Sequence, residues 1–320
     1  MKLSRAVISL SVLTLGLSAL ALPAQAAAPA LPAGDQLVTL SCNDDDVTFH
    51  TVDAQTGTIT AVGAPNEGYN CAYQGAWDVT TQTFFAVIED SSENRLVVID
   101  TTTGALTEIG PIVKADDSPV NVYSMVIGLD GKAYVNNFNE LYSLDLITGE
   151  ATLLGTLDGV TNAAYGFSVD PTTGKLYLLQ ESGELLLVDP VAVTATLVGT
   201  WPVPEELESY GISIDHAGTA WVVIYPGEDS YSALWSTPLA TFGVDPQLSG
   251  DIVTAEGVDP TQWWVALVYK AAPAPAPAPA PAPEPALAAT GFDAAPLALG
   301  GLLLAAAGVV LVGRRSRRAA

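Results

Sequence analysis

The fold is decided by a segment of twelve residues that occurs four times along the chain. Its first copy reads Val52-Asp53-Ala-Gln-Thr-Gly57-Thr-Ile-Thr-Ala-Val-Gly63, and the other copies run over 99–110, 144–155 and 188–199. In every copy an Asp stands ten residues before the closing Gly. The Asp side chain can accept hydrogen bonds from the backbone of a turn. In three copies a Gly stands four residues after the Asp and can supply a left-handed backbone position, whereas the last copy has Val193 there. Each copy is therefore predicted to form two strands joined by a tight turn.

The segments between these copies repeat as well. Each contains a strand with small residues, a turn and a second strand, at 75–79 with 83–88, 124–128 with 132–135, 166–169 with 175–179, and 211–214 with 219–224. The whole unit recurs every 44 to 47 residues, which is the length of one four-stranded propeller blade. The region 37–270 is accordingly predicted to be an all-β propeller.

The strand count predicts five blades. Strands at 37–41, 47–52 and 58–62 lack an inner partner, which the C-terminal strand 263–269 supplies, so that one C-terminal and three N-terminal strands close the ring. The fifth blade is predicted to have a third strand near 231–235 and a degenerate outer strand near 252–256. Because 239–257 aligns poorly with the repeats, six blades remain the alternative.

The segments 166–174 and 211–218 each end in a turn that runs from an Asp to a Gly, at Asp170 to Gly174 and Asp215 to Gly218. These turns resemble those of YVTN and lactonase-like propellers. That resemblance covers the repeats only, and it implies a channel that in hydrolases of the lactonase kind holds a metal ion. The chain has no Gly-x-Ser-x-Gly motif. Asp78, Asp170 and Asp215 follow the spacing of the turns, on the face opposite the expected ligand face. The propeller is therefore predicted to be non-catalytic, with a metal-dependent lactonase-like hydrolase as the alternative.

The C-terminal region has the pattern of a targeting signal. Leu287-Ala288-Ala289-Thr290-Gly291 precedes an uncharged span, 295–312, and a basic tail, 313–320. This arrangement resembles the cell-wall sorting signals of Gram-positive bacteria, and Ala288 resembles the actinobacterial variant read by class E sortases. The resemblance implies that a sortase cleaves after Thr290 and links it to peptidoglycan, so that the chain spans the membrane only before sorting. A permanent membrane anchor is the alternative.

Two further segments agree with export. Residues 1–26 have a basic start, an apolar run and a small-x-small cleavage site, which is typical of a secretory signal peptide. Residues 271–286 alternate Pro and Ala, which favours a semi-rigid polyproline II linker over a disordered tail. The expected location is the cell-wall surface of a Gram-positive, actinobacterial cell.

The charge of the mature region is strongly negative. The whole chain has a formal net charge of −24, and only Arg95, Lys114, Lys132, Lys175 and Lys270 are basic between Ala27 and Thr290. Nucleic acids and anionic lipid surfaces require a basic footprint, so both are excluded as expected partners.

Cys42 and Cys71 are the only two cysteines. In an exported chain they predict a disulfide, and the strand map places both on the same face of the propeller, called the top face. The two histidines, His50 and His216, stand alone in the sequence and are expected to be structural.

The top face also carries the candidate ligand and metal sites. Tyrosines recur just before the inner strand of each unit, at Tyr73, Tyr123, Tyr165 and Tyr210, where they can form a stacking surface or simply pack between blades. Asp44, Asp45 and Asp46 head a set of acidic loops, for which Ca²⁺ is the candidate cation and solvated charge the alternative. A channel filled by aromatic and Met side chains would favour binding; carboxylates or amides converging on an ion would favour hydrolysis. The expected function is binding or adhesion toward an extracellular protein or glycan.

Overall fold

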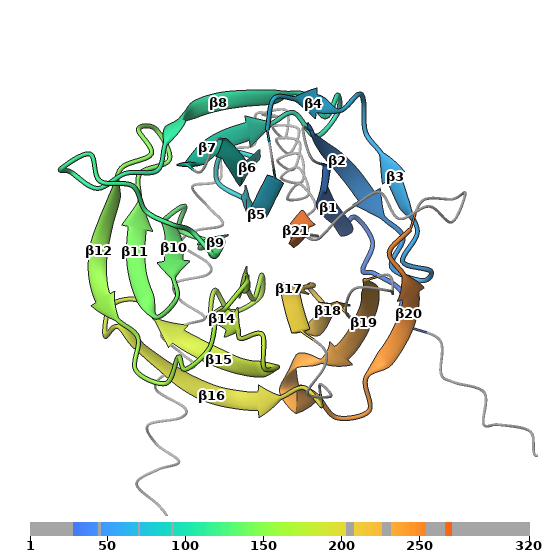
Figure 1. Ribbon diagram of the computed structural model, residues 1–320. Helices are drawn as coiled ribbons and strands as arrows, with labels where there is room; N and C mark the ends of the chain where they lie inside the picture. The colour runs from blue at the N-terminus through green and yellow to red at the C-terminus, as the bar shows by residue number, and fades with distance from the viewer. Residues whose placement is uncertain are drawn as a thin grey trace, which may run out of the picture. The chain divides into compact units, whose positions relative to one another are not determined.

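The computed structural model describes residues 28–43, 46–69, 71–90, 93–202, 208–225, 232–253 and 266–270. They belong to one compact unit, 1–273. In this unit the chain forms five antiparallel sheets arranged around a common axis (Figure 1). The prediction of an all-β, five-bladed propeller is confirmed, and the six-bladed alternative is wrong.

Blades 2 to 5 each use four consecutive strands, ordered outward from the axis. Blade 2 contains β5 (Cys71–Asp78), β6 (Thr83–Asp90), β7 (Glu93–Ile99) and β8 (Leu106–Pro111). Blade 3 contains β9 (Ser124–Ile127), β10 (Ala133–Asn137), β11 (Glu140–Leu144) and β12 (Ala151–Thr156). Blade 4 contains β13 (Gly166–Val169), β14 (Leu176–Leu179), β15 (Glu184–Asp189) and β16 (Thr194–Thr200). Blade 5 contains β17 (Glu208–Ile214), β18 (Thr219–Tyr225), β19 (Ala233–Pro238) and β20 (Gln247–Asp251).

Blade 1 joins the two ends of this unit, as predicted. Its order outward is β21 (Ala266–Lys270), β1 (Gln36–Asn43), β2 (Asp46–Val52) and β3 (Ile59–Ala61), and a short β4 (Asn66–Glu67) also pairs with β2. Leu37 lies opposite Tyr269 in this closure. Of the predicted closing strand, 266–269 is observed as strand, and 263–265 lie outside the described residues.

The innermost strands contact one another in a closed cycle, β21 to β5, β9, β13, β17 and back to β21. Between neighbouring blades lie five separate apolar layers. In the layer between blades 1 and 2, for example, the rings of Phe49 and Phe84 are 5.3 Å apart. Because both faces of a blade are covered, strands such as β14 are buried along their whole length and read as continuous apolar runs.

The outer strand of blade 5 was predicted at the wrong place. It lies at Gln247–Asp251, whereas the prediction was 252–256. The turn before it is longer than in the other blades, because it contains a 3₁₀ helix, η1 (Leu239–Thr241), followed by Asp245 at φ 47°. The inserted residues hide the repeat, yet Gly250 still stands where the closing Gly of the other copies stands.

In blades 2 to 5 the closing Gly follows a β-bulge. In four blades the ladder between the third and the outer strand skips one residue, which is Ile109, Leu154, Val198 or Ser249. A bulge bends the strand and increases its twist. The bend brings the following Gly against the turn of the next blade.

Candidate functional site

The axis of the propeller is crossed by one amide side chain. Gln74, on β5 and only 1% exposed, donates from Nε2 to the carbonyl of Phe167 at 3.0 Å. Its Oε1 accepts from the backbone N–H groups of Phe167 and Met125, each at 3.4 Å. Inner strands have one edge without a strand partner, so the amide supplies there the donor and acceptor that another strand would supply. Nothing in the sequence marks Gln74 for this role.

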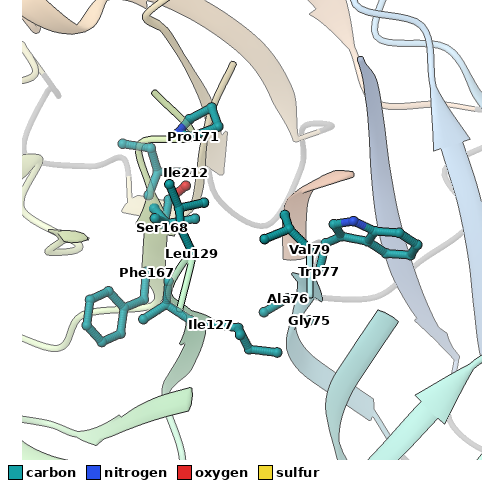
Figure 2. Close-up of a pocket in the computed structure, with 12 residues that line it drawn as sticks. Gly75, Ala76, Trp77, Val79, Ile127, Leu129, Phe167, Ser168, Pro171 and Ile212 are labelled. Atoms are coloured by element: carbon teal, nitrogen blue, oxygen red, sulfur yellow. The ribbon is translucent and has the colours of Figure 1, made fainter. Parts of the chain in front are cut away.

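An apolar pocket lies beside the same strands. It is lined mainly by hydrophobic side chains of the inner strands and of the turns that follow them, with Ser168 as the polar side chain (Figure 2). Trp77 and Val79 line one side, and Phe167 and Leu129 line the other. The cavity volume is about 30 Å³. The described part of the axis is thus closed by apolar side chains and one hydrogen-bonded amide.

Two of the four predicted tyrosines are brought together. Tyr123 and Tyr165 immediately precede β9 and β13, as predicted, and their ring centroids are 5.3 Å apart with an interplanar angle of 54°. Both side chains are half-buried. A tilted pair at this distance is favourable for aromatic rings and leaves part of the ring surface open to a ligand.

The other two tyrosines do not precede a strand. Tyr73 lies inside β5 and Tyr210 inside β17, and each is the residue that the ladder skips at a bulge. The prediction of their position was therefore wrong. The hairpins of blades 2 and 5 continue beyond the bulge, so that the inner strand begins earlier than in blades 3 and 4. Their side chains lie outside the described set.

A buried polar network joins the residues next to the two tyrosines in the chain. Ser124, next to Tyr123, donates its hydroxyl to Oδ1 of Asn136, and it also contacts the carbonyl of Ala164, next to Tyr165, at 3.2 Å. Asn136 donates to the same carbonyl at 3.1 Å. Ser124, Asn136 and Ala164 are all fully buried. The backbone on which both tyrosines stand is thereby fixed across the boundary between blades 3 and 4.

The structure describes only one of the three predicted calcium ligands. Asp46 begins β2, and Asp44 and Asp45 lie outside the described residues. Within the part of the chain that the structure describes, no three His, Cys, Asp or Glu side chains form a group suited to a metal ion. One acidic cluster there is neutralised in part by Arg95, which pairs with Asp90 at 2.9 Å, Glu108 at 2.5 Å and Glu93 at 3.6 Å.

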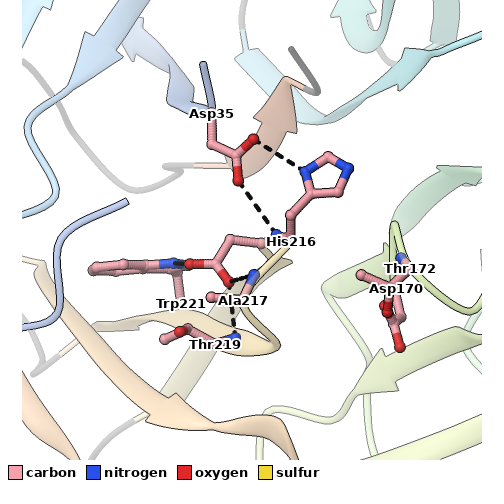
Figure 3. Close-up of polar contacts among 8 residues, drawn as sticks. Asp35, Asp170, Thr172, His216, Ala217, Thr219 and Trp221 are labelled. Carbon is pink, nitrogen blue, oxygen red and sulfur yellow. Dashed lines mark hydrogen bonds and ion pairs between the residues drawn. The ribbon is translucent and has the colours of Figure 1, made fainter. Parts of the chain in front are cut away.

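The inner-turn aspartates accept hydrogen bonds from their own turns, in line with their spacing in the sequence. The Asp170 carboxylate accepts hydrogen bonds from the backbone and hydroxyl groups of Thr172 and Thr173, and Asp78 is held in the same way by Thr80 and Thr81. Burial alone would raise the pKa of Asp170, but the hydrogen bonds outweigh it and hold the pKa below its ordinary value. Asp215 instead accepts from the indole of Trp221 at 3.0 Å and from two turn N–H groups (Figure 3).

Neither histidine stands alone, in contrast to its appearance in the sequence. His216 of blade 5 meets Asp35, which precedes β1: Nδ1 lies 3.0 Å from one carboxylate oxygen and the backbone N–H donates to the other at 3.3 Å (Figure 3). This contact ties blade 5 to blade 1 at the ring closure. His50 on β2 is 4% exposed, with Nε2 2.7 Å from the Ser41 hydroxyl. Burial lowers the pKa of His50 to about 4.

The remaining predicted sites include residues that lie, wholly or in their side chains, outside the described part of the chain. Cys71 is disulfide-bonded, and Cys42 is the one other cysteine of the chain; the Cys42 side chain lies outside the described set, so the pairing stays a prediction. Leu287, Ala288, Ala289, Thr290 and Gly291, the signal peptide, the linker and the apolar span also lie outside it. Among described residues there is no helix of the length and hydropathy needed to cross a membrane.

Comparison with known proteins identifies no family. No family model matches the chain, and no curated protein does. Among solved structures, a chain of a nidogen/laminin complex has a TM-score of 0.48 at 10% identity, covering 75% of this chain and 99% of that one. TolB from Acinetobacter baumannii has a TM-score of 0.44 at 14% identity, covering 69% and 54%. The PQQ-bound aldose sugar dehydrogenase from Streptomyces coelicolor has a TM-score of 0.37 at 16% identity, covering 68% and 86%. At these values the similarities carry no argument about function.

Proposed function

We propose that this chain is a non-catalytic binding module displayed on the cell wall, and that its ligand, an extracellular protein or glycan, binds the top face. The observation that carries the proposal is the Tyr123–Tyr165 pair, half-buried and 5.3 Å apart between two neighbouring blades. Aromatic rings fixed in this way offer a large contact area at low entropic cost. The hydrogen-bond network of Ser124 and Asn136, next to both tyrosines in the chain, keeps the surface preorganised.

The state of the axis supports binding over hydrolysis. A lactonase-like mechanism needs several carboxylates or amides around a channel metal, and the Gln74 amide is instead committed to the backbone of Phe167 and Met125. Its neighbours in the pocket are apolar. The carboxylate oxygens of the inner-turn aspartates likewise accept hydrogen bonds from groups in or next to their own turns.

The display part of the proposal rests on the sequence segments at both ends. Cleavage by a sortase would leave Thr290 as the terminus joined to peptidoglycan. Intact mass of wall fragments released by a muramidase is the test. A species ending at Thr290 with cross-bridge peptide supports sorting, and a membrane-bound species that keeps 295–320 contradicts it.

The binding part is tested with cells that display the full chain. Adhesion to panels of immobilised glycans and extracellular proteins is measured for wild type, Y123A/Y165A and the matched Y123F/Y165F variant, which keeps both rings. We expect the alanine pair to lose adhesion at least about tenfold and the phenylalanine pair to keep most of it. Equal adhesion of all three would mean that the top-face tyrosines do not contact the ligand. Turnover of lactones by the wild type in the presence of Ca²⁺ would instead favour the hydrolase.

A further inference from the structure

Blade 3 carries an exposed aromatic residue in a backbone conformation that disfavours it. Phe138 is the first residue of the two-residue turn between β10 and β11, and its φ is 53°. Left-handed positions in such turns favour Gly, Asn or Asp, and a bulky side chain there is uncommon. The Phe138 side chain is 39% exposed, so burial in the core does not explain it either. A residue that neither the turn nor the core requires is a candidate for a functional role.

Phe138 lies at the same end of the blade as the tyrosine pair. β9 and β10 are antiparallel, so the start of β9, which Tyr123 precedes, is beside the end of β10, which Phe138 follows. The fully buried Asn136 connects these residues. Its backbone carbonyl accepts from the N–H of Tyr123 at 2.9 Å. Its Nδ2 donates to the carbonyl of Phe138 at 3.2 Å and to that of Ala164, next to Tyr165, at 3.1 Å. One buried residue thus positions the backbone beside three aromatic rings, here called the aromatic platform.

The chain segments that carry the platform contain no charged residue. These segments are 121–123, 136–139 and 161–165, in a chain with 35 Asp and Glu residues. The nearby carboxylates of Glu140 and Glu184 accept hydrogen bonds from neutral groups, which are a tyrosine hydroxyl for Glu140 and an amide and a serine hydroxyl for Glu184. An uncharged aromatic area on so acidic a chain favours a ligand without a net charge. The partly or fully exposed polar side chains of the three segments are those of Asn121, Asn137, Asn139, Thr161 and Asn162.

The asparagines supply the polar groups that a sugar requires. A carboxamide has both donors and an acceptor, as do two neighbouring hydroxyl groups of a sugar ring, so one amide can bond both hydroxyls. In the part of the chain that the structure describes, the side chains of Asn121, Asn137 and Asn139 form no hydrogen bond with another residue. Asn162 donates from Nδ2 to the Ser182 hydroxyl at 3.0 Å, and its Oδ1 can still accept. Aromatic rings with amides around them therefore match a ligand that has apolar faces and hydroxyl edges.

We propose that the aromatic platform of Tyr123, Phe138 and Tyr165 binds a neutral glycan, an inference that rests on the proposed function and narrows its ligand to one class. The C–H groups on a face of a sugar ring are slightly positive, so they pack against the negative face of an aromatic ring. The asparagine amides bond the hydroxyl groups. A carboxylated glycan is repelled by the net charge of −24, and a basic protein is attracted to the acidic loops instead.

The test is the binding of cells that display the full chain to an array of defined oligosaccharides and extracellular proteins. The array holds neutral hexose and N-acetylhexosamine oligomers beside sialylated and uronate glycans. Wild type is compared with Y123A/Y165A and with F138N, which removes the third ring and gives the turn a residue that it favours. I147T is the matched control, because Ile147 is 85% exposed in another turn of blade 3 and blade 2 has Thr102 at that turn position.

We expect wild type and I147T to bind neutral oligosaccharides alike. F138N and Y123A/Y165A should need at least about tenfold more of a labelled neutral oligosaccharide for half-maximal binding. F138N should keep or raise the free energy of unfolding, since Asn suits the left-handed position.

Three results would overturn the inference. If F138N binds neutral glycans as wild type does, or loses binding only together with stability, Phe138 is not part of the site. If only proteins or charged glycans bind, and Y123A/Y165A loses that binding, the ligand class is wrong while the binding module stands. If wild type and Y123A/Y165A behave alike toward every member of the array, the proposed function fails as well.

Discussion

Gly63, which closes the first repeat, lies against Gly104 in the turn of the second, backbone to backbone. A Cβ on Gly63 would overlap the carbonyl oxygen of Thr103, and a Cβ on Gly104 would overlap that of Val62. The same relation recurs around the ring, where Gly149 faces Pro111, Gly243 faces Thr200 and Gly250 faces Thr56. The two glycines of the repeat thus serve a contact between blades as well as the turn within each blade.

Substitution G104A is expected to destabilise the propeller by at least about 3 kcal/mol, because the new methyl group would overlap the backbone carbonyl of Val62. Gly218 is the matched control. Its φ of +76° is close to the +72° of Gly104, but nothing lies within 4 Å of a Cβ there. G218A should therefore cost only about 1 kcal/mol from backbone strain. Chemical denaturation measures both, and equal losses would show that strain alone explains the conserved spacing within this chain.

The fourth repeat replaces the turn Gly by Val193 at φ 53°, and the side chain then occupies the inter-blade space itself. Its Cγ1 lies 3.2 Å from where a Cβ on Gly155 would stand. We expect G155A and V193G to be coupled by about 1 kcal/mol, because removal of the Val side chain makes room for the methyl group. In a double-mutant cycle the control pair G155A and V191G, with Val191 91% exposed, should be additive. Additivity of the first pair would exclude the contact as the reason for Gly155.

These contacts between blades also explain which features of the fold could be predicted from the sequence and which could not. The spacing of Asp and Gly predicted the turns and the number of blades, because both depend on the local repeat. The closure of the ring followed from the strand count, since three N-terminal strands lacked an inner partner. The outer strand of blade 5 was misplaced because η1 lengthens its turn. The role of the closing Gly was missed, although its constant spacing was visible, because its partner lies in the next blade.

The candidate site was predictable to a smaller extent. Repetition of tyrosine before the inner strand located Tyr123 and Tyr165, whereas the bulges at Tyr73 and Tyr210 depend on how far each hairpin extends. Gln74 has no equivalent in the other repeats, and its partner Phe167 is 93 residues away. Similarly, the pairing of His216 with Asp35 bridges 181 residues and follows only from the closure of the ring.

Gln74 supplies the next prediction. Substitution Q74E keeps the shape of the side chain but replaces the N–H donor to Phe167 by a second acceptor, which then faces a carbonyl in a buried site. We expect a loss of at least about 3 kcal/mol at neutral pH. The loss should shrink under acidic conditions, since a protonated carboxyl group can donate again and burial favours that form.

The control for this substitution is Q82E. Gln82 also donates to a backbone carbonyl, that of Val79 at 2.9 Å, but it is exposed in a turn. Its substitution should change the free energy of unfolding by about 0.5 kcal/mol or less at any pH. If Q74E is as mild as Q82E, the amide across the axis does not contribute to stability.

His50 predicts a dependence of stability on pH. Burial lowers its pKa from 6.5 to about 4, so between these values the unfolded chain binds more protons than the folded one. Its contribution to stability is therefore complete above pH 6.5 and is lost as the pH falls toward 4. The shift corresponds to about 3 kcal/mol. Asp78 and Asp170, whose pKa values lie below 3.8, lose their contributions at lower pH, so the two effects separate.

The measurement is the free energy of unfolding of the wild type and of H50Q from pH 7 to pH 4. The Gln side chain can still contact the Ser41 hydroxyl but does not titrate in this range. The wild type should lose stability relative to H50Q as the pH falls, and the difference between them should level off near pH 4. H216Q is the matched control, because His216 is partly exposed at the ring closure. Parallel curves for the wild type and H50Q would show that His50 is protonated in the folded chain without cost.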